Sequence, residues 1–179
     1  MRKVILKMHV SLDGFVATPR GELDWLLRDF DDELAAWEVE GLWRAGVHIM
    51  GRATYHEMAA HWPTSTEPFA SPMNEIPKVV FSKTLTETEW SGSRVADGEL
   101  TDEIARLREE PGKHILAHGG AGFAQSLSRL RLIDEYQLVV HPVGLGAGLP
   151  LFSDPIDLRL LNTRTFKSGL LALTYAPAT

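Results

Sequence analysis

The sequence contains no cysteine, so disulfides, thiol catalysis and zinc sites built from cysteine are all excluded. No apolar run approaches the roughly 18 residues of a membrane span, and Met1-Arg2-Lys3 enters an alternating pattern instead of an apolar signal core. An excess of positive charge is also absent, since the formal net charge is −6 and the basic residues are scattered. We therefore expect a single cytoplasmic domain over residues 1–179 that binds neither nucleic acid nor a membrane surface.

What the sequence does contain is a strand-to-helix junction with an arginine in it. Val47–Met50 has strand character, Gly51 follows, and the residues from Arg52 onward open a short helix. Such a junction presents unpaired backbone N–H groups and the positive end of a helix dipole, both of which attract phosphate. The guanidinium of Arg52 and the hydroxyl of Thr54 add phosphate ligands of their own. The stretch Val47–Met58 therefore predicts an anion site.

Strand and helix patterns alternate as far as Leu130, which is typical of a parallel sheet with helices on its faces. The expected strands are Val4–Val10, Val47–Met50, Lys78–Phe81 and His114–His118. The expected helices run from the Asp31 cap to Ala45-Gly46, from Gly51 to His61-Trp62-Pro63, from the Thr101 cap to Pro111-Gly112, and through a stripe of Phe123, Leu127 and Leu130. The proline-rich segment Thr64–Pro77 is expected to be a loop.

The pattern changes after Asp134. Tyr136–His141 is an expected strand that Pro142 ends, and two further strand-like runs, Leu158–Phe166 and Leu170–Tyr175, are joined by hairpin residues. The fold class that we predict is therefore three-layer α/β/α, with a mixed, mostly parallel central sheet and an antiparallel C-terminal edge.

Four loops with chemistry-bearing residues follow the four parallel strands. They are Asp13–Ala17, Gly51–Thr54, Ser82–Thr84 and Gly119–Phe123. The carboxyl ends of parallel strands meet at one edge of a sheet, and ligands of open α/β sheets bind there. Each loop alone is weak evidence, because Gly-Arg is usually a turn and Gly-Gly is usually close packing. Four such corners on one edge predict a dinucleotide, which needs several phosphate-binding corners along a line.

The spacing of these residues does not match the common nucleotide, metal or hydrolase motifs. The G-x-G-x-x-G fingerprint that Gly120 and Gly122 would begin has Gln125 at its sixth position, and no P-loop sequence occurs. A metal site is not predicted, since His114 and His118 would lie about 13 Å apart on a strand. No G-x-S-x-G elbow supports Ser-His-Asp hydrolysis either.

Two features of the sequence, Asp13 and a group of tryptophans, each have two interpretations. Asp13 either forms a turn with Gly14 or holds or protonates a substrate, and the sequence favours neither. Four tryptophans gather in the first third of the chain. Core packing is their ordinary role, although a tryptophan could also line a site for a flat aromatic substrate.

The four corners together resemble the dihydrofolate reductase superfamily. Within that superfamily, Ser11-Leu12-Asp13-Gly14 and the run from Leu132-Ile133-Asp134-Glu135 through Pro142 to Gly144-Leu145-Gly146 look like the C-terminal reductase domain of the bifunctional riboflavin-biosynthesis deaminase-reductase. The resemblance covers nearly the whole chain. It implies hydride transfer from C4 of a reduced nicotinamide to a C=N or C=O carbon.

The resemblance also implies NADPH as the cofactor and roles for particular residues. By that likeness, Gly51, Arg52, Thr54, Ser82 and Lys83 hold its phosphates, the 2′-phosphate included. Gly119, Gly120, Ala121, Gly122 and Phe123 would let the backbone approach the pyrophosphate. Val16 and Ala17 match positions that hold the nicotinamide amide by their backbone, and Asp13 is the catalytic candidate.

The substrate that the resemblance implies is pterin-like or ribosylaminopyrimidine-like. Where folate reductases carry an acidic residue on the preceding helix, the same count reaches Ala35, with Asp31, Asp32 and Glu33 nearby. Dihydrofolate reduction and nucleotide binding with little catalysis are the alternatives. A homodimer is expected as well, through the C-terminal hairpin and the Thr64–Pro77 segment.

Overall fold

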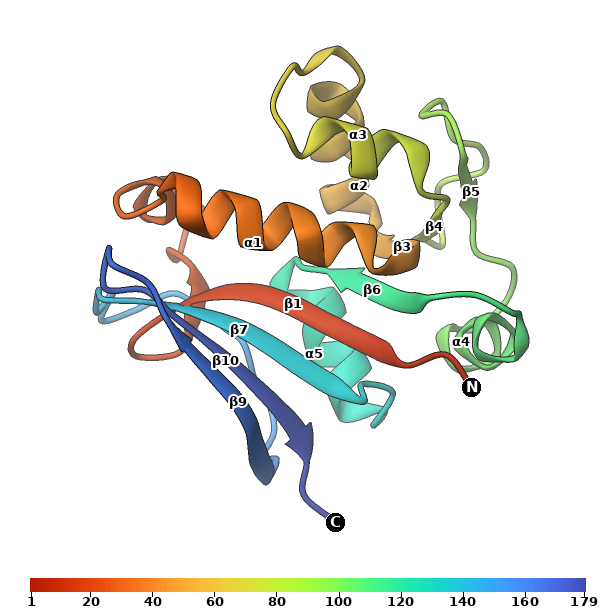
Figure 1. Cartoon of the computed structure of the whole chain (residues 1–179). Coiled ribbons are helices and arrows are strands. Elements are labelled where there is room, and N and C mark those ends of the chain that lie inside the picture. The colour runs from red at the N-terminus through yellow and green to blue at the C-terminus, as the bar shows by residue number, and fades with distance from the viewer.

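The computed structural model describes all 179 residues, and its centre is an eight-stranded sheet with helices on both faces (Figure 1). The sheet order is β5 (Ser93–Val95), β4 (Lys78–Phe81), β3 (Ala45–Gly51), β6 (His114–His118), β1 (Val4–Ser11), β7 (Glu135–His141), β10 (Leu171–Pro177) and β9 (Leu158–Thr165). The α-helices are α1 (Asp32–Trp43), α2 (Arg52–His61), α3 (Ala70–Glu75), α4 (Leu100–Glu109) and α5 (Ala121–Arg129). No helix combines the length and the apolar character that crossing a membrane requires.

The pairing of the strands confirms the predicted sheet. β5, β4, β3, β6, β1 and β7 run parallel, whereas β10 is antiparallel to both β7 and β9. The predicted bounds of β4 and β6 are those observed. The hairpin of β9 and β10 turns at Gly169, whose φ of +92° is a conformation that glycine adopts without strain.

Alternation along β1 places different chemistry on the two faces of the sheet. Val4, Leu6 and Met8 belong to the core that α4 and α5 cover, whereas Lys7 and His9 lie on the opposite face, under α1. Figure 1 shows α1 crossing that face of β1 and β6. The period of two that marks a strand therefore delivers two polar side chains to the interface between β1 and α1.

Helix α1 begins where its cap was predicted. The Asp31 carboxylate accepts a hydrogen bond from the Leu34 N–H at 2.8 Å, which satisfies one of the free donors of the first turn. Leu34, Glu38 and Leu42 are its buried residues, and their spacing of four places them on one stripe. The buried stripe of α1 thus carries a glutamate between two leucines.

Several expected boundaries were wrong. Ala45 and Gly46 belong to β3, so α1 ends earlier than expected, and Thr101 lies inside α4, which starts at Leu100 after an N-cap at Glu99. Leu130 is 44% exposed because it caps the end of α5 instead of extending its buried stripe.

One helix and three short strands were not expected. Helix α3 forms inside Thr64–Pro77, because its proline stands in the first turn, where the missing N–H has no helical partner to lose. The edge strand β5 was missed. A second sheet pairs β2 (Phe15–Ala17) with β8 (Leu149–Pro150), and strands of two or three residues are too short to show a period.

Candidate functional site

Four parallel strands that are neighbours in space, β4, β3, β6 and β1, release the chain at the same edge of the sheet. Their outgoing loops are the four predicted corners, Ser82–Thr84, Gly51–Thr54, Gly119–Phe123 and Asp13–Ala17, in that spatial order. A ligand lying along this edge would meet all four in succession.

The corners after β3 and β4 are in direct contact. Nη1 of Arg52 donates a hydrogen bond to the Thr84 hydroxyl at 3.3 Å, and both residues are exposed. The Ser82 hydroxyl oxygen accepts the N–H groups of Thr84 and Leu85 at 3.2 and 3.0 Å, which fixes the loop that also carries exposed Lys83. Two cationic side chains therefore stand at one surface without a carboxylate partner within 4.0 Å.

The corner after β6 is tied to the corner after β3. The Thr54 hydroxyl donates a hydrogen bond to the Gly119 carbonyl oxygen. A Cβ at Gly119 would lie 2.1 Å from Sδ of Met8, so the backbone approaches β1 more closely than a side chain would allow without a shift of Met8. Beyond it, α5 starts at Ala121 without a side-chain cap, and a Cβ at Gly122 would meet open space.

The ring of Phe123 packs between the corners instead of pointing away from them. It lies 5.5 Å from the ring of Phe81, centroid to centroid, and its Cβ is 3.5 Å from the position of a Cβ on Gly51. Phe123 thereby holds the start of α5 against the ends of β3 and β4.

Val16 and Ala17 are buried in the short strand β2. Ala17 pairs with Leu149 of β8, and a Cβ at Gly148 would lie 2.2 Å from the Ala17 carbonyl oxygen. Gly148 is therefore required for the close approach of these two backbone segments. Their predicted contact with a nicotinamide amide stays a prediction.

The Asp13 carboxylate fastens two loops together. It accepts hydrogen bonds from the Ser11 hydroxyl at 2.6 Å and from the N–H groups of Leu145 and Gly146 at 3.0 and 2.8 Å. These donors, the Ser11 hydroxyl first, lower the pKa of Asp13 to about 2. Asp13 is therefore ionised at neutral pH and joins the loop after β1 to the loop after β7.

A cavity of about 150 Å³ opens beside these corners, between α1, β1 and the segment that contains α2 and α3. Its apolar walls are Leu42, Met58, Trp62, Phe69 and Met73, and its polar residues are Lys7, His9, Glu38 and His118. Apolar walls with a few polar groups are typical of sites for small organic ligands. The cavity is hereafter called the α1 pocket.

Glu38 is the central polar residue of the α1 pocket. Its Oε1 accepts a hydrogen bond from Nε2 of His9 at 2.7 Å and lies 3.7 Å from Nζ of Lys7. Burial raises the pKa of Glu38, but the hydrogen bond and the charges of these two neighbours outweigh it, so that the net pKa is lowered. The other ring nitrogen of His9 lies 2.7 Å from Nε2 of His141, whose pKa burial lowers to about 4.

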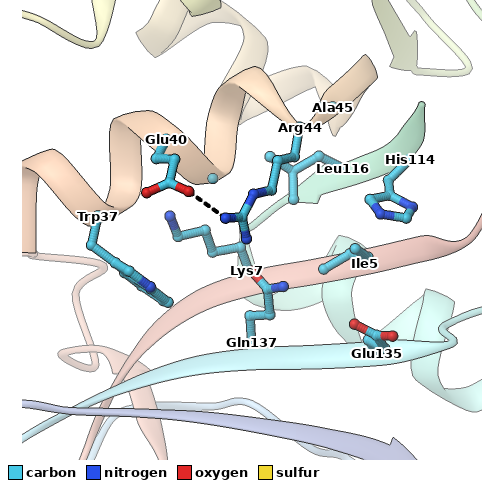
Figure 2. A pocket seen from close by; sticks show the side chains of 11 residues that line it. Ile5, Lys7, Trp37, Glu40, Arg44, Ala45, His114, Leu116, Glu135 and Gln137 are labelled. Carbon is cyan, nitrogen blue, oxygen red and sulfur yellow. Dashed lines mark hydrogen bonds and ion pairs between the residues drawn. The ribbon is translucent and has the colours of Figure 1, made fainter. Parts of the chain in front are cut away.

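Another cavity, of about 170 Å³, lies on the same face of the sheet at the other ends of the strands (Figure 2). Its lining includes His114 and Glu135, the first residues of β6 and β7, so it is remote from the four corners. Figure 2 shows the guanidinium of Arg44 paired with Glu40 there. We assign the functional site to the α1 pocket, because only the carboxyl ends of the strands carry the corners.

The polar residues of the α1 pocket were missed in the sequence, although a signal for Glu38 exists. Counting along the helix as in folate reductases reaches Ala35, and Glu38 lies three residues further on, at nearly one turn of helix. A glutamate at the centre of an apolar stripe marks a buried carboxylate that needs partners. Lys7 and His9 supply them from the polar face of β1. No three metal-ligating side chains are grouped so that they could hold a metal ion.

The sheet order, with its parallel strands and antiparallel C-terminal hairpin, defines an α/β domain of the kind found in riboflavin biosynthesis proteins. The chain belongs to the RibD C-terminal domain family, whose model matches residues 2–172. The uncharacterized protein YyaP of Bacillus subtilis is 34% identical over 182 residues, covering 97% of this chain and 94% of YyaP.

Solved structures share the fold. A candidate riboflavin biosynthesis protein from Shewanella sp. PV-4 is 26% identical with a TM-score of 0.76, and the match covers 99% of both chains. A diaminohydroxyphosphoribosylaminopyrimidine deaminase/5-amino-6-(5-phosphoribosylamino)uracil reductase from Thermotoga maritima is 18% identical with a TM-score of 0.71. That match covers 99% of this chain and 57% of the Thermotoga chain, and it shows likeness of fold.

We expect Asp13→Asn to lower the free energy of unfolding, more at neutral than at acidic pH. Because the folded-state pKa of about 2 lies below the ordinary 3.8, the carboxylate contributes stability above about pH 4 and loses it as the pH falls toward about 2. Urea unfolding of the wild type and the variant across this range measures the effect, with Asp32→Asn as the exposed control. A difference that does not change with pH would contradict the assignment.

Proposed function

We propose that this protein is an NADPH-dependent reductase that transfers a hydride to a C=N or C=O of a pterin-like or ribosylaminopyrimidine-like substrate. The observation that carries the proposal is the joining of three corners at one edge of the sheet. Arg52 bonds Thr84 across β3 and β4, and Thr54 bonds Gly119 across β3 and β6. His118, which directly precedes Gly119, lines the α1 pocket, so the pocket adjoins the corner after β6.

The residues at this edge fit a dinucleotide with an additional phosphate. Arg52 and Lys83 supply positive charge, and the hydroxyls of Ser82 and Thr84 supply neutral donors. The start of α5 offers uncapped N–H groups, and a Cβ at Gly122 in its first turn would meet open space. We assign the 2′-phosphate to the first group and the pyrophosphate to the second.

The α1 pocket is the proposed substrate site. When bound, reduced nicotinamide supplies the hydride from its C4. Glu38 then orients the substrate, since a buried ionised carboxylate accepts N–H groups of a flat heterocycle, while Trp62 and Phe69 exclude water from its faces. Asp13 contributes by holding the loops after β1 and β7 in place. The Glu38 carboxylate also keeps dihydrofolate among the substrates to be tested.

Arg52→Ala tests the cofactor assignment. We expect NADPH binding to weaken by roughly 1–3 kcal/mol, about 5- to 150-fold, because a charge-assisted phosphate bond is lost, while NADH binding hardly changes. Fluorescence titration with both cofactors measures this, and Arg159→Ala, on exposed β9, is the control. Equal losses for NADPH and NADH would refute the 2′-phosphate contact and leave the pyrophosphate as the partner of Arg52.

Glu38→Gln tests the substrate site. The variant keeps the shape of the side chain but removes its charge, so we expect kcat/KM to fall at least about tenfold with the affinity for NADPH unchanged. Steady-state rates with pterins, dihydrofolate and the aminopyrimidine substrate of riboflavin biosynthesis provide the measurement. Glu40→Gln, on the exposed side of the same helix, should behave as wild type. Unaltered kcat/KM in Glu38→Gln would remove the α1 pocket from the proposal.

We also propose a homodimer that forms through the C-terminal hairpin. The contribution of Thr64–Pro77 to the contact stays a prediction: Ala70, Met73 and Ile76 are buried in this chain's own core, whereas other residues of the segment, such as Glu67 and Pro68, are exposed. Strand β9 is a free edge along which Leu160 and Leu161 are 52% and 43% exposed. Sedimentation equilibrium should show a dimer that Leu160→Lys and Leu161→Lys together convert to monomer; a monomeric wild type would refute it.

A further inference from the structure

Two histidines, His48 on β3 and His118 on β6, form a hydrogen-bonded pair beneath the α1 pocket. Both side chains are buried, at 0% and 9% exposure. Nε2 of His118 lies 2.9 Å from Nδ1 of His48, and Nε2 of His48 lies 3.2 Å from the Pro72 carbonyl oxygen. His118 lines the α1 pocket and is paired across the sheet with Lys7.

The partners of the pair determine where its protons lie. The Pro72 carbonyl can only accept, so Nε2 of His48 carries a hydrogen. Burial lowers the pKa of His48 to about 4, which keeps the ring neutral and leaves Nδ1 as an acceptor. That acceptor takes the hydrogen on Nε2 of His118. Burial, His48 and Lys7 hold the pKa of His118 well below its ordinary value, so its Nδ1 carries no proton.

The free nitrogen of His118 is open to the pocket. Nδ1 of His118 has no hydrogen-bond partner in the protein, and it is not fully buried. The fully buried side-chain atoms that lack a partner are Trp25 Nε1, His141 Nδ1 and Ser168 Oγ. Oε2 of Glu38 likewise has no partner and is not fully buried. The α1 pocket therefore presents two hydrogen-bond acceptors from opposite elements, one on β6 and one on α1.

We propose that the His48–His118 pair determines the specificity of the α1 pocket by presenting Nδ1 of His118 as a fixed acceptor, so that the ligand is a flat heterocycle bearing N–H donors. The inference rests on the proposed function in taking this pocket as the substrate site. An exocyclic amino group or a ring N–H satisfies His118. An oxo group in that position places its oxygen, an acceptor, against Nδ1 of His118, which is also an acceptor. Neither atom then has a donor, and this opposes binding.

The proton positions can be measured directly on the wild-type protein. Two-dimensional ¹H–¹⁵N spectra of the imidazole rings should show both His48 and His118 as the tautomer with the hydrogen on Nε2. In His48→Phe the acceptor for His118 is lost, and we expect His118 to populate both tautomers. A hydrogen on Nδ1 of His118 in the wild type would overturn the proposal without any variant.

Ligand discrimination is the second test, with 2,4-diaminopyrimidine and 1,3-dimethyluracil, a dioxo compound that has no N–H donor, as the probes. The wild type should bind the diamino compound at least about tenfold more tightly than the dioxo compound. His118→Phe should bring the two affinities closer together, because Glu38 alone then discriminates. His114→Phe, on the same strand but lining the other cavity, should keep the preference of the wild type.

Equal affinities in the wild type, or a preference that His118→Phe leaves intact, would refute the specificity role. Both measurements are made without cofactor, and NADPH affinity is determined on the same preparations. If NADPH binds but His118 has its hydrogen on Nδ1, or the two pyrimidine probes bind equally, this inference is rejected and the cofactor assignment stands. Discrimination without NADPH binding would support the inference and reject the reductase.

Discussion

Parallel pairing of β4, β3, β6 and β1 is the constraint on which the rest of the structure depends. Parallel neighbours have to be joined by crossover connections, and these place helices on the faces of the sheet. The same constraint brings the carboxyl ends of the four strands to one edge of the sheet, where the chain leaves each strand and enters a helix or loop. Residues distant in sequence, such as Arg52 and Thr84, come into contact there for that reason.

The face of the sheet under α1 is subject to a different constraint, which is the burial of charged side chains. Lys7, His9 and Glu38 are largely buried, and burying such groups costs free energy unless they pair. Here the carboxylate has a hydrogen bond from His9 and a nearby ammonium from Lys7, so the charges compensate one another. An apolar helix-sheet contact would hold α1 in place equally well. We therefore assign the polar set to the recognition of a polar ligand, beside the corners that we assign to the cofactor.

Much of the fold follows from the sequence, because strong local signals coincide with the global arrangement. The Asp31 cap, the strands Lys78–Phe81 and His114–His118, and the hairpin at Gly169 all lie where their patterns indicate. The elements that were missed are too short to show a period, namely β2, β5, β8 and the six-residue helix α3, which has a proline in its first turn. The candidate site divides in the same way. Glycines and hydroxyls at strand ends are visible in the sequence, since local backbone geometry requires them. The α1 pocket is not visible, because Glu38, His9 and His118 come from three separate elements and meet only through the crossing of α1 over β1 and β6.

NADPH binding at the edge formed by the four corners underlies the whole functional assignment. Its most direct test is a titration of the wild-type protein with NADPH and with NADH, followed by the quenching of tryptophan fluorescence. We expect saturable quenching at micromolar NADPH, with weaker binding of NADH. Absence of binding by either cofactor would contradict the assignment, because the four corners would then serve only the packing of helices on the sheet.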